Sequence, residues 1–164
     1  MRIAVAFLLT LSLAACGFHL RGQAALPFES LYVSGTSVFV NQLKRAVRAG
    51  SKTRVTDNQK DAQATLQILS EVTERTILSL SSSGRVREIT LRYRISFRLH
   101  DQENREYIPT SEILMRRDLS YSDTDVIAKE YEEALLFRDM QSDAVQQLMR
   151  RLQAARMDVR SNAE

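Results

Sequence analysis

Cys16 is the only cysteine in the 164-residue chain, and its surroundings point to a specific chemistry. It ends the tetrapeptide Leu13-Ala14-Ala15-Cys16, which follows an apolar stretch that begins at Ile3 and is preceded by the basic residue Arg2. A basic start, an apolar stretch and small residues before a cut are the parts of an export leader, and a cysteine at the cut is typical of bacterial lipoproteins. We therefore expect residues 1–15 to be removed and Cys16 to carry acyl chains on its sulfur and amine.

The leader predicts an anchored protein and not one that spans the membrane. Its apolar stretch is too short for a permanent spanning helix, whereas several acyl chains give stable anchoring. Gly17 follows the cysteine, in the place where lipoproteins kept in the inner membrane usually carry Asp, so we expect export to the outer membrane. The small residues would also suit an ordinary secretory leader, which would leave Cys16 as an unused thiol.

A second group of residues suited to chemistry is a row of arginines. Arg92, Arg94 and Arg98 alternate with apolar residues, so they project from one face of a predicted strand, and Arg85 lies at its entrance. Guanidinium groups bind phosphate and carboxylate with paired hydrogen bonds, so an anionic ligand or partner is one interpretation. The other interpretation is a solvated surface that binds no ligand. Lys129, near the start of a predicted helix, is by itself an ordinary surface cation.

Neither catalysis nor metal binding is predicted. The cluster Ser81–Ser83 precedes Gly84 and has the composition of a turn, and no G-x-S-x-G elbow is present. His19 and His100 are the only histidines, too few for a structural metal site when the cysteine is acylated. A periplasmic hydrolase would need a nucleophile and base that these residues do not supply, so we predict a protein that is no enzyme and has no cofactor.

Composition and length limit the class of function and the number of domains. The formal net charge of +3 is only mildly basic, which does not predict a nucleic-acid-binding protein. The length after cleavage fits one domain with a proper core. We expect a lipidated tether over residues 16–28, a single α+β domain over residues 29–157 and a flexible tail over residues 158–164.

The periodicity of apolar residues predicts the elements that must position these groups. A short strand over 28–34 precedes a helix with Ser37 as N-cap and Gly50 as its stop. Residues 51–60 are polar and turn-like. Three strands follow over 65–80, 88–99 and 107–121, with Pro109 indicating an edge, and then a helix over 126–157 with N-cap chemistry at Asp123, Thr124 and Asp125.

Two of these predictions concern faces of elements. The strand over 65–80 is expected to place one alternating set on a single face, with Glu74 as its one charged member: Leu66, Ile68, Ser70, Val72, Thr76, Leu78 and Leu80. The last helix is expected to bury one apolar stripe: Tyr131, Ala134, Leu135, Val145, Leu148, Leu152 and Ala155.

Together these elements predict an α+β, two-layer sandwich, with a four-stranded mixed sheet and two helices packed on one face. Short turns make the three later strands a meander, and the first strand is expected to pair in parallel with one of them. The second face of the sheet then has no helical cover.

Four segments carry a resemblance to a known family: Cys16-Gly17-Phe18-His19-Leu20-Arg21-Gly22, Leu43-Lys44-Arg45-Ala46-Val47, Ile127-Ala128-Lys129-Glu130 and Gln147-Leu148-Met149-Arg150-Arg151-Leu152. In order and spacing they resemble the lipopolysaccharide-assembly lipoproteins that accompany the outer-membrane transport barrel. The resemblance extends from residue 1 to about residue 157.

The resemblance implies an α+β sandwich that forms a 1:1 complex with the barrel, plugs its lumen, helps it assemble and binds lipopolysaccharide. It also implies a basic pair for the lipid phosphates. The helix member of the pair corresponds to Lys129. The turn member corresponds to Ser82, which is no cation, so Arg85 is the nearest candidate and Arg92 a third. The protein would be lipid-anchored on the periplasmic side of the outer membrane and inserted in the barrel lumen.

A different class of function would share the leader and the sandwich. An auxiliary lipoprotein of a periplasmic ABC-type lipid or solute transport system is the alternative. Such a protein would associate with an inner-membrane permease and not with a large β-barrel.

Overall fold

The computed structural model describes residues 25–122 and 125–156. The leader, Cys16 and its predicted lipidation, His19, residues Asp123 and Thr124 and the tail over residues 158–164 lie outside the described residues. The elements, in chain order, are β1 (Ser30–Val33), α2 (Val38–Gly50), β2 (Arg54–Thr56), the 3-10 turn η1 (Gln59–Asp61), β3 (Ala64–Leu80), β4 (Val86–Asp101), β5 (Glu106–Ser120) and α3 (Val126–Ala154).

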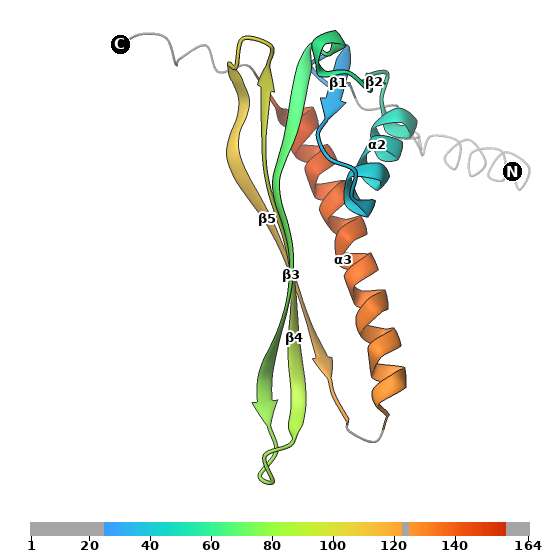
Figure 1. Ribbon diagram of the computed structural model, residues 1–164, viewed down its shortest axis with the longest axis vertical. Coiled ribbons are helices and arrows are strands. Elements are labelled where there is room, and N and C mark those ends of the chain that lie inside the picture. The colour runs from blue at the N-terminus through green and yellow to red at the C-terminus, as the bar shows by residue number, and fades with distance from the viewer. Residues whose placement is uncertain (1–24, 123–124, 157–164) are drawn as a thin grey trace, which may run out of the picture.

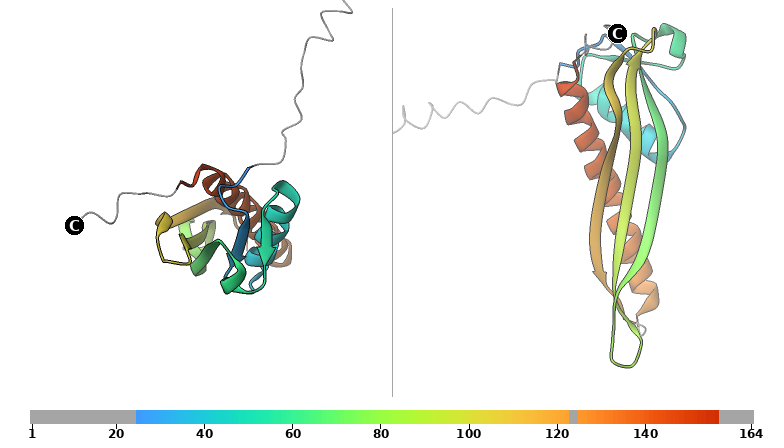
Figure 2. Two further views of the ribbon diagram at one scale, coloured as in Figure 1. Left: turned by 90° about the horizontal axis from the view of Figure 1, so that it is seen from above. Right: turned by 90° about the vertical axis from the view of Figure 1, so that its left-hand side faces the viewer.

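The strands form one mixed sheet in the order β2-β1-β3-β4-β5. β1 is parallel to both β2 and β3, whereas β3, β4 and β5 form an antiparallel meander. Both helices lie on the same side of this sheet, as the right-hand view of Figure 2 shows. The α+β class, the mixed sheet with two helices, the meander and the parallel pairing of the first strand are confirmed.

The number of strands was predicted wrongly, because the sheet has five strands and not four. The additional strand, β2, lies within the segment over 51–60 that we predicted to be a turn. It has only three residues, of which Val55 alone is apolar, and it occupies the edge of the sheet beside β1. An element this short shows no period in the sequence, and its pairing depends on β1 being present to receive it.

The helix α2 forms where the spacing of the apolar residues changes from that of a strand to that of a helix. The backbone N–H of Val40 donates to the hydroxyl of Ser37, which confirms the predicted N-cap. Gly50 is the last helical residue, and the C-cap is Ser51, whose N–H donates to the carbonyl of Val47. The side chains that face the sheet are all buried, at helical spacing: Phe39, Val40, Leu43 and Val47.

The molecule is elongated and its two ends differ (Figure 1). At the wide end, β1, β2 and α2 lie beside β3 and α3, and the apolar core is continuous. At the narrow end only β3, β4, β5 and the first half of α3 remain, because β1 pairs with β3 only as far as Leu66. The β3–β4 turn forms the tip of this narrow end (Figure 1).

A β-bulge in β3 overturns the predicted alternation of that strand. The pairing of β3 with β4 shifts between Ile68 and Ser70, so that Glu71, and not Ser70, is opposite the core residue Ile95. One extra residue exchanges the two faces of a strand beyond it. Val72 and Thr76 therefore share the face of the β4 arginines, and the set that we expected on one face is divided between two.

The predicted apolar stripe of α3 is buried only in its second half. Val145, Leu148 and Leu152 are buried against the core. Tyr131 and Leu135 are instead 75% and 56% exposed. The inward side of the first half carries Leu136 and Phe137, which pack against the core, so Tyr131 and Leu135 fall on the outer side of the helix.

Candidate functional site

Arg85 lies at the tip of the narrow end, where β3 turns into β4. The turn is closed by backbone hydrogen bonds between Ser81 and Arg85 and between Gly84 and Ser81, and Gly84 has a φ of +77°. A positive φ suits glycine, which has no Cβ. The Ser81 hydroxyl accepts from the backbone N–H of Arg85. The Arg85 side chain is exposed and forms no ion pair with the described residues, so its guanidinium keeps its donors for a ligand.

Lys129 lies in the first turn of α3, at the same end of the molecule as Arg85 (Figure 1). Its Nζ donates to Oε2 of Glu132 at 2.8 Å and to the hydroxyl of Ser120 at 3.4 Å. Only 19% of its side chain is exposed. The first turn of the helix is therefore tied to the end of β5, and the Lys129 charge is partly neutralised by Glu132.

Arg92 lies further along β4, on the face of the sheet that no helix covers. It is four residues beyond Glu88, which lies next to the turn, and four residues of strand span about 13 Å at 3.3 Å per residue. Its Nη1 is 4.0 Å from Glu74 of β3. The structure thus brings Arg85 and Lys129 to one end of the molecule and leaves Arg92 on a separate surface.

The uncovered face is not the purely cationic surface that β4 alone suggested, because the neighbouring strands add carboxylates. Arg94 lies 3.8 Å from both Glu74 of β3 and Glu112 of β5. Exposed ion pairs of this kind contribute little to stability and exchange partners readily. An anionic ligand would have to compete with these carboxylates for Arg92 and Arg94, but not for Arg85.

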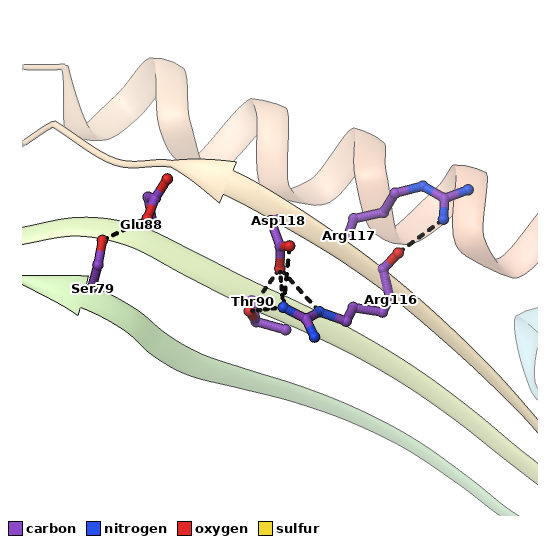
Figure 3. A network of polar contacts seen from close by, with 6 residues as sticks. All are labelled: Ser79, Glu88, Thr90, Arg116, Arg117 and Asp118. Carbon is purple, nitrogen blue, oxygen red and sulfur yellow. Dashed lines mark hydrogen bonds and ion pairs between the residues drawn. The ribbon is translucent and has the colours of Figure 1, made fainter.

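Figure 3 shows the part of this network nearest the narrow end. Asp118 accepts hydrogen bonds from the Thr90 hydroxyl at 2.7 Å and from the Arg116 guanidinium at 3.2 Å. The Thr90 bond, and after it the Arg116 bond, lowers the pKa of Asp118. A carboxylate that stays charged holds Arg116 in place, beside Arg92 in the pairing of β4 with β5.

Arg116 is the residue that sequence reasoning missed on this face. Ile113, Met115 and Leu119 alternate along β5, so the sequence itself indicates that Arg116 lies on the opposite face from these apolar residues. The adjacency of Arg116 to Arg92 could not be predicted, because it depends on the register between two strands. Arg117, by contrast, points to the helix side and forms an ion pair with Asp143 of α3 at 2.6 Å (Figure 3 shows the arginine).

Other kinds of site are not found in the parts of the chain that the structure describes. No group of three or more potential metal ligands occurs within residues 25–122 and 125–156. The helices over these same residues are not long and apolar enough for one of them to cross a membrane.

Comparison with known proteins gives a family match over most of the chain. The family model LptE, described as lipopolysaccharide-assembly, matches residues 28–152. No curated protein matches the sequence.

Solved structures match as well. The solution structure of the uncharacterized lipoprotein B from Nitrosomonas europaea is 40% identical, covers 84% of this chain and 91% of its own, and superposes with a TM-score of 0.74. The rare lipoprotein B from Shewanella oneidensis is 23% identical, covers 74% of this chain and 91% of its own, and has a TM-score of 0.64. The minor lipoprotein from Acinetobacter baumannii is 22% identical, covers 79% and 93%, and has a TM-score of 0.64, so these two share the fold.

Proposed function

Because the chain belongs to the lipopolysaccharide-assembly family, we propose that it is the lipid-anchored partner of the outer-membrane β-barrel that exports lipopolysaccharide. Family membership makes it a lipoprotein of lipopolysaccharide assembly and outer-membrane biogenesis, in a family that is not enzymatic. In the proposed role it forms a 1:1 complex with the barrel, helps the barrel to assemble, occupies its lumen from the periplasmic side and binds the glycolipid. Cys16 carries the acyl chains.

The observation that carries the proposal is the match of the family model over residues 28–152, nearly the whole described domain. The shape of the molecule supports it. The narrow end is slender, because only three strands and one helix form it, and it ends in a turn whose one cation, Arg85, is exposed (Figure 1). An elongated body with a slender tip suits insertion into a barrel.

The glycolipid is proposed to meet the narrow end through its phosphates. Arg85 supplies a guanidinium with free donors, and Lys129 supplies a second positive charge at the same end. Arginine and lysine are both suited to phosphate, arginine through paired hydrogen bonds. Arg92 is a more distant third contact, because its charge is shared with Glu74.

Co-purification tests the complex. The full-length lipoprotein is isolated from native outer membranes in mild detergent, and the proteins that remain bound are identified and quantified. A large β-barrel at a ratio of one to one is expected. Recovery of an inner-membrane permease would instead indicate an auxiliary transport lipoprotein, and recovery of no partner would contradict the complex.

A further inference from the structure

β3 has one long edge with which no strand of the described residues pairs. β1 pairs with β3 only from Ala64 to Leu66, and just beyond this pairing the hydroxyl of Ser34 accepts from the backbone N–H of Ile68. Over residues 69–80 the only described strand that pairs with β3 is β4, so β3 is the outermost strand of the narrow end (Figure 1). We call the other side of residues 69–80 the free edge.

The backbone groups of alternate residues point to the free edge. In a strand, residues whose side chains face one side of the sheet direct their N–H and C=O groups to one edge, and their neighbours direct theirs to the other. On β3, the side chain of Leu66 is in the core and its carbonyl accepts from Ser34 on the β1 side. Beyond the bulge, Thr73, Arg75 and Ile77 lie opposite core residues of β4, so they share the orientation of Leu66. Their N–H and C=O groups are therefore directed to the free edge, where no described strand receives them.

The free edge lacks the features that usually protect an edge strand. β3 contains no Lys and no Pro, and none of residues 69–80 is buried. β5, the other long edge strand, contains Pro109 and packs against α3. A long edge with exposed apolar side chains is a template for another strand, so the free edge is suited to receive one. Five side chains of residues 69–80 are large, apolar and exposed: Leu69, Val72, Ile77, Leu78 and Leu80.

A cavity on the helix side of β3 can receive a side chain of an added strand. It has a volume of about 340 Å³ and is lined by Arg75, Tyr121, Glu130, Glu133, Ala134 and Phe137. Arg75 is paired with Glu133 at 3.4 Å, whereas Glu130 forms no ion pair with a described residue. A long basic side chain would place its methylene groups along Ala134 and Phe137 and its charge beside Glu130. Pockets of this kind give strand addition its specificity.

We propose that an extended segment of the barrel partner adds to the sheet as a strand along the free edge. This inference rests on the proposed function, in which the barrel chain surrounds the narrow end and no second copy of this chain shares the lumen. The strands of a closed barrel have no free edge of their own, so the added strand is a segment of a connecting loop that folds into the lumen. It carries β-branched and other apolar side chains against β3, and a basic side chain for the cavity.

Hydrogen exchange at single amides tests the pairing. The full-length lipidated protein is measured alone in mild detergent and in the complex co-purified with the barrel, and electron-transfer fragmentation with mass spectrometry resolves individual amides. Thr73, Arg75 and Ile77 report on the free edge. Leu114 and Arg116 are matched controls, because they lie opposite Arg94 and Arg92 on the uncovered face and, by the same alternation, their N–H groups point to the outer edge of β5.

The three amides of the free edge should exchange at least about tenfold more slowly in the complex than in the free protein, because the added strand pairs them. The amides of Leu114 and Arg116 should change by less than about twofold. Unchanged exchange at the free edge in a complex that contains the barrel would overturn the proposal. Equal slowing of the two controls would also overturn it, since it would show exclusion of water from the lumen and not pairing. Slowing that occurs only in a dimer of the isolated protein would identify a second copy as the occupant and contradict the proposal.

A pair of proline variants separates strand addition from folding. Thr73→Pro removes an N–H that points away from β4, so it keeps the β3–β4 hydrogen bonds and interrupts the free edge. It should abolish most of the slowing at Arg75 and Ile77 in the complex. Leu114→Pro, the matching change at the outer edge of β5, should preserve that slowing. Undiminished slowing at Arg75 and Ile77 in T73P would contradict the pairing.

The same samples distinguish failure of the inference from failure of the proposed function. If no barrel is recovered with the lipoprotein, the proposed complex is contradicted, and the strand addition with it. If the barrel is recovered and the free edge exchanges as in the isolated protein, only the strand addition is contradicted. The wild-type comparison decides between these outcomes even if T73P does not fold.

Discussion

The hydroxyl of Tyr93 donates a 2.7 Å hydrogen bond to Oε1 of Glu71, in the layer between the sheet and α3. Nε2 of Gln141, on α3, lies 3.5 Å from the same oxygen. Burial, and after it the bond to Glu71, raises the pKa of Tyr93, so the hydroxyl remains a donor at every physiological pH. The contact therefore joins the middle of β3 and β4 to α3.

Replacement of Tyr93 by Phe should destabilise the domain by about 1.5 kcal/mol, because it removes a hydrogen bond to a carboxylate and leaves Glu71 with one weaker partner. Tyr131→Phe makes the same chemical change at a side chain that is 75% exposed, and should change the stability by less than about 0.5 kcal/mol. Urea unfolding followed by circular dichroism measures both. Equal effects of the two variants would show that the Glu71 bond contributes nothing.

The turn between β4 and β5 predicts a dependence of stability on acid pH. Asp101 accepts 2.8 Å and 2.7 Å hydrogen bonds from the backbone N–H and the Nε of Arg105. Burial by itself raises the pKa of Asp101, but these bonds and the Arg105 charge outweigh it and hold the pKa below its ordinary value of 3.8. The unfolded chain therefore binds a proton more tightly than the folded one, so acid favours unfolding.

The stabilisation from Asp101 should be complete above about pH 4 and be lost as the pH falls through its lowered folded pKa. Asp101→Asn removes this titration, so the stability difference between the wild type and the variant should shrink from about pH 6 to about pH 2.5. Asp139→Asn, at an exposed carboxylate with no ion pair among the described residues, is the control. A difference that stays constant with pH would contradict the role of Asp101.

Much of the fold could be predicted because the relevant signals are local. Ser37 and the period of Phe39, Leu43 and Val47 suffice to place α2, and the strict alternation of β4 suffices to place its core face. The strand β2 and the bulge in β3 could not be predicted in this way. A three-residue strand has no period, and an extra residue at a bulge is visible only against the partner strand.

The same distinction between local signals and signals that depend on a partner strand applies to the candidate site. The positions of Arg85 in a turn and Lys129 in the first turn of a helix follow from local sequence. The carboxylates that neutralise Arg92 and Arg94 belong to β3 and β5, so their effect depends on the register of the whole sheet. An arginine row on one strand therefore says which cations share a face, but not whether that face is positively charged.

Two leucines of α3, Leu135 and Leu148, should differ in their contribution to stability. Leu148 is completely buried and Leu135 is 56% exposed, although both were predicted to belong to one stripe. Leu148→Ala should cost about 2 to 5 kcal/mol, because it leaves a cavity in the core. Leu135→Ala should cost less than about 0.5 kcal/mol. Urea unfolding measures both, and amide exchange should be faster in the first half of the helix than in the second. Equal costs would contradict the placement of Leu135 on the exposed side of the helix.

The glycolipid site gives the prediction with the clearest consequence for function. The variant R85E/K129E reverses both positive charges at the narrow end, so it should weaken binding of purified lipopolysaccharide to the full-length protein by about tenfold or more, since hydrogen bonds to charged groups are lost and repulsion is added. Wild-type affinity should also fall with added salt. R138E/R150E is the control, because it reverses two exposed cations on other parts of α3.

The comparison of the two double variants decides whether position or total charge matters. Both change the net charge by the same amount, so a general attraction to an anionic lipid would weaken equally in each. A site at the narrow end requires that only R85E/K129E lose affinity while both proteins keep the far-ultraviolet circular dichroism of the wild type. Unchanged affinity in R85E/K129E would remove Arg85 and Lys129 from the site. Binding would then have to involve other surfaces, of which the uncovered face with Arg92 and Arg116 is the next to test, by R92E and R116E.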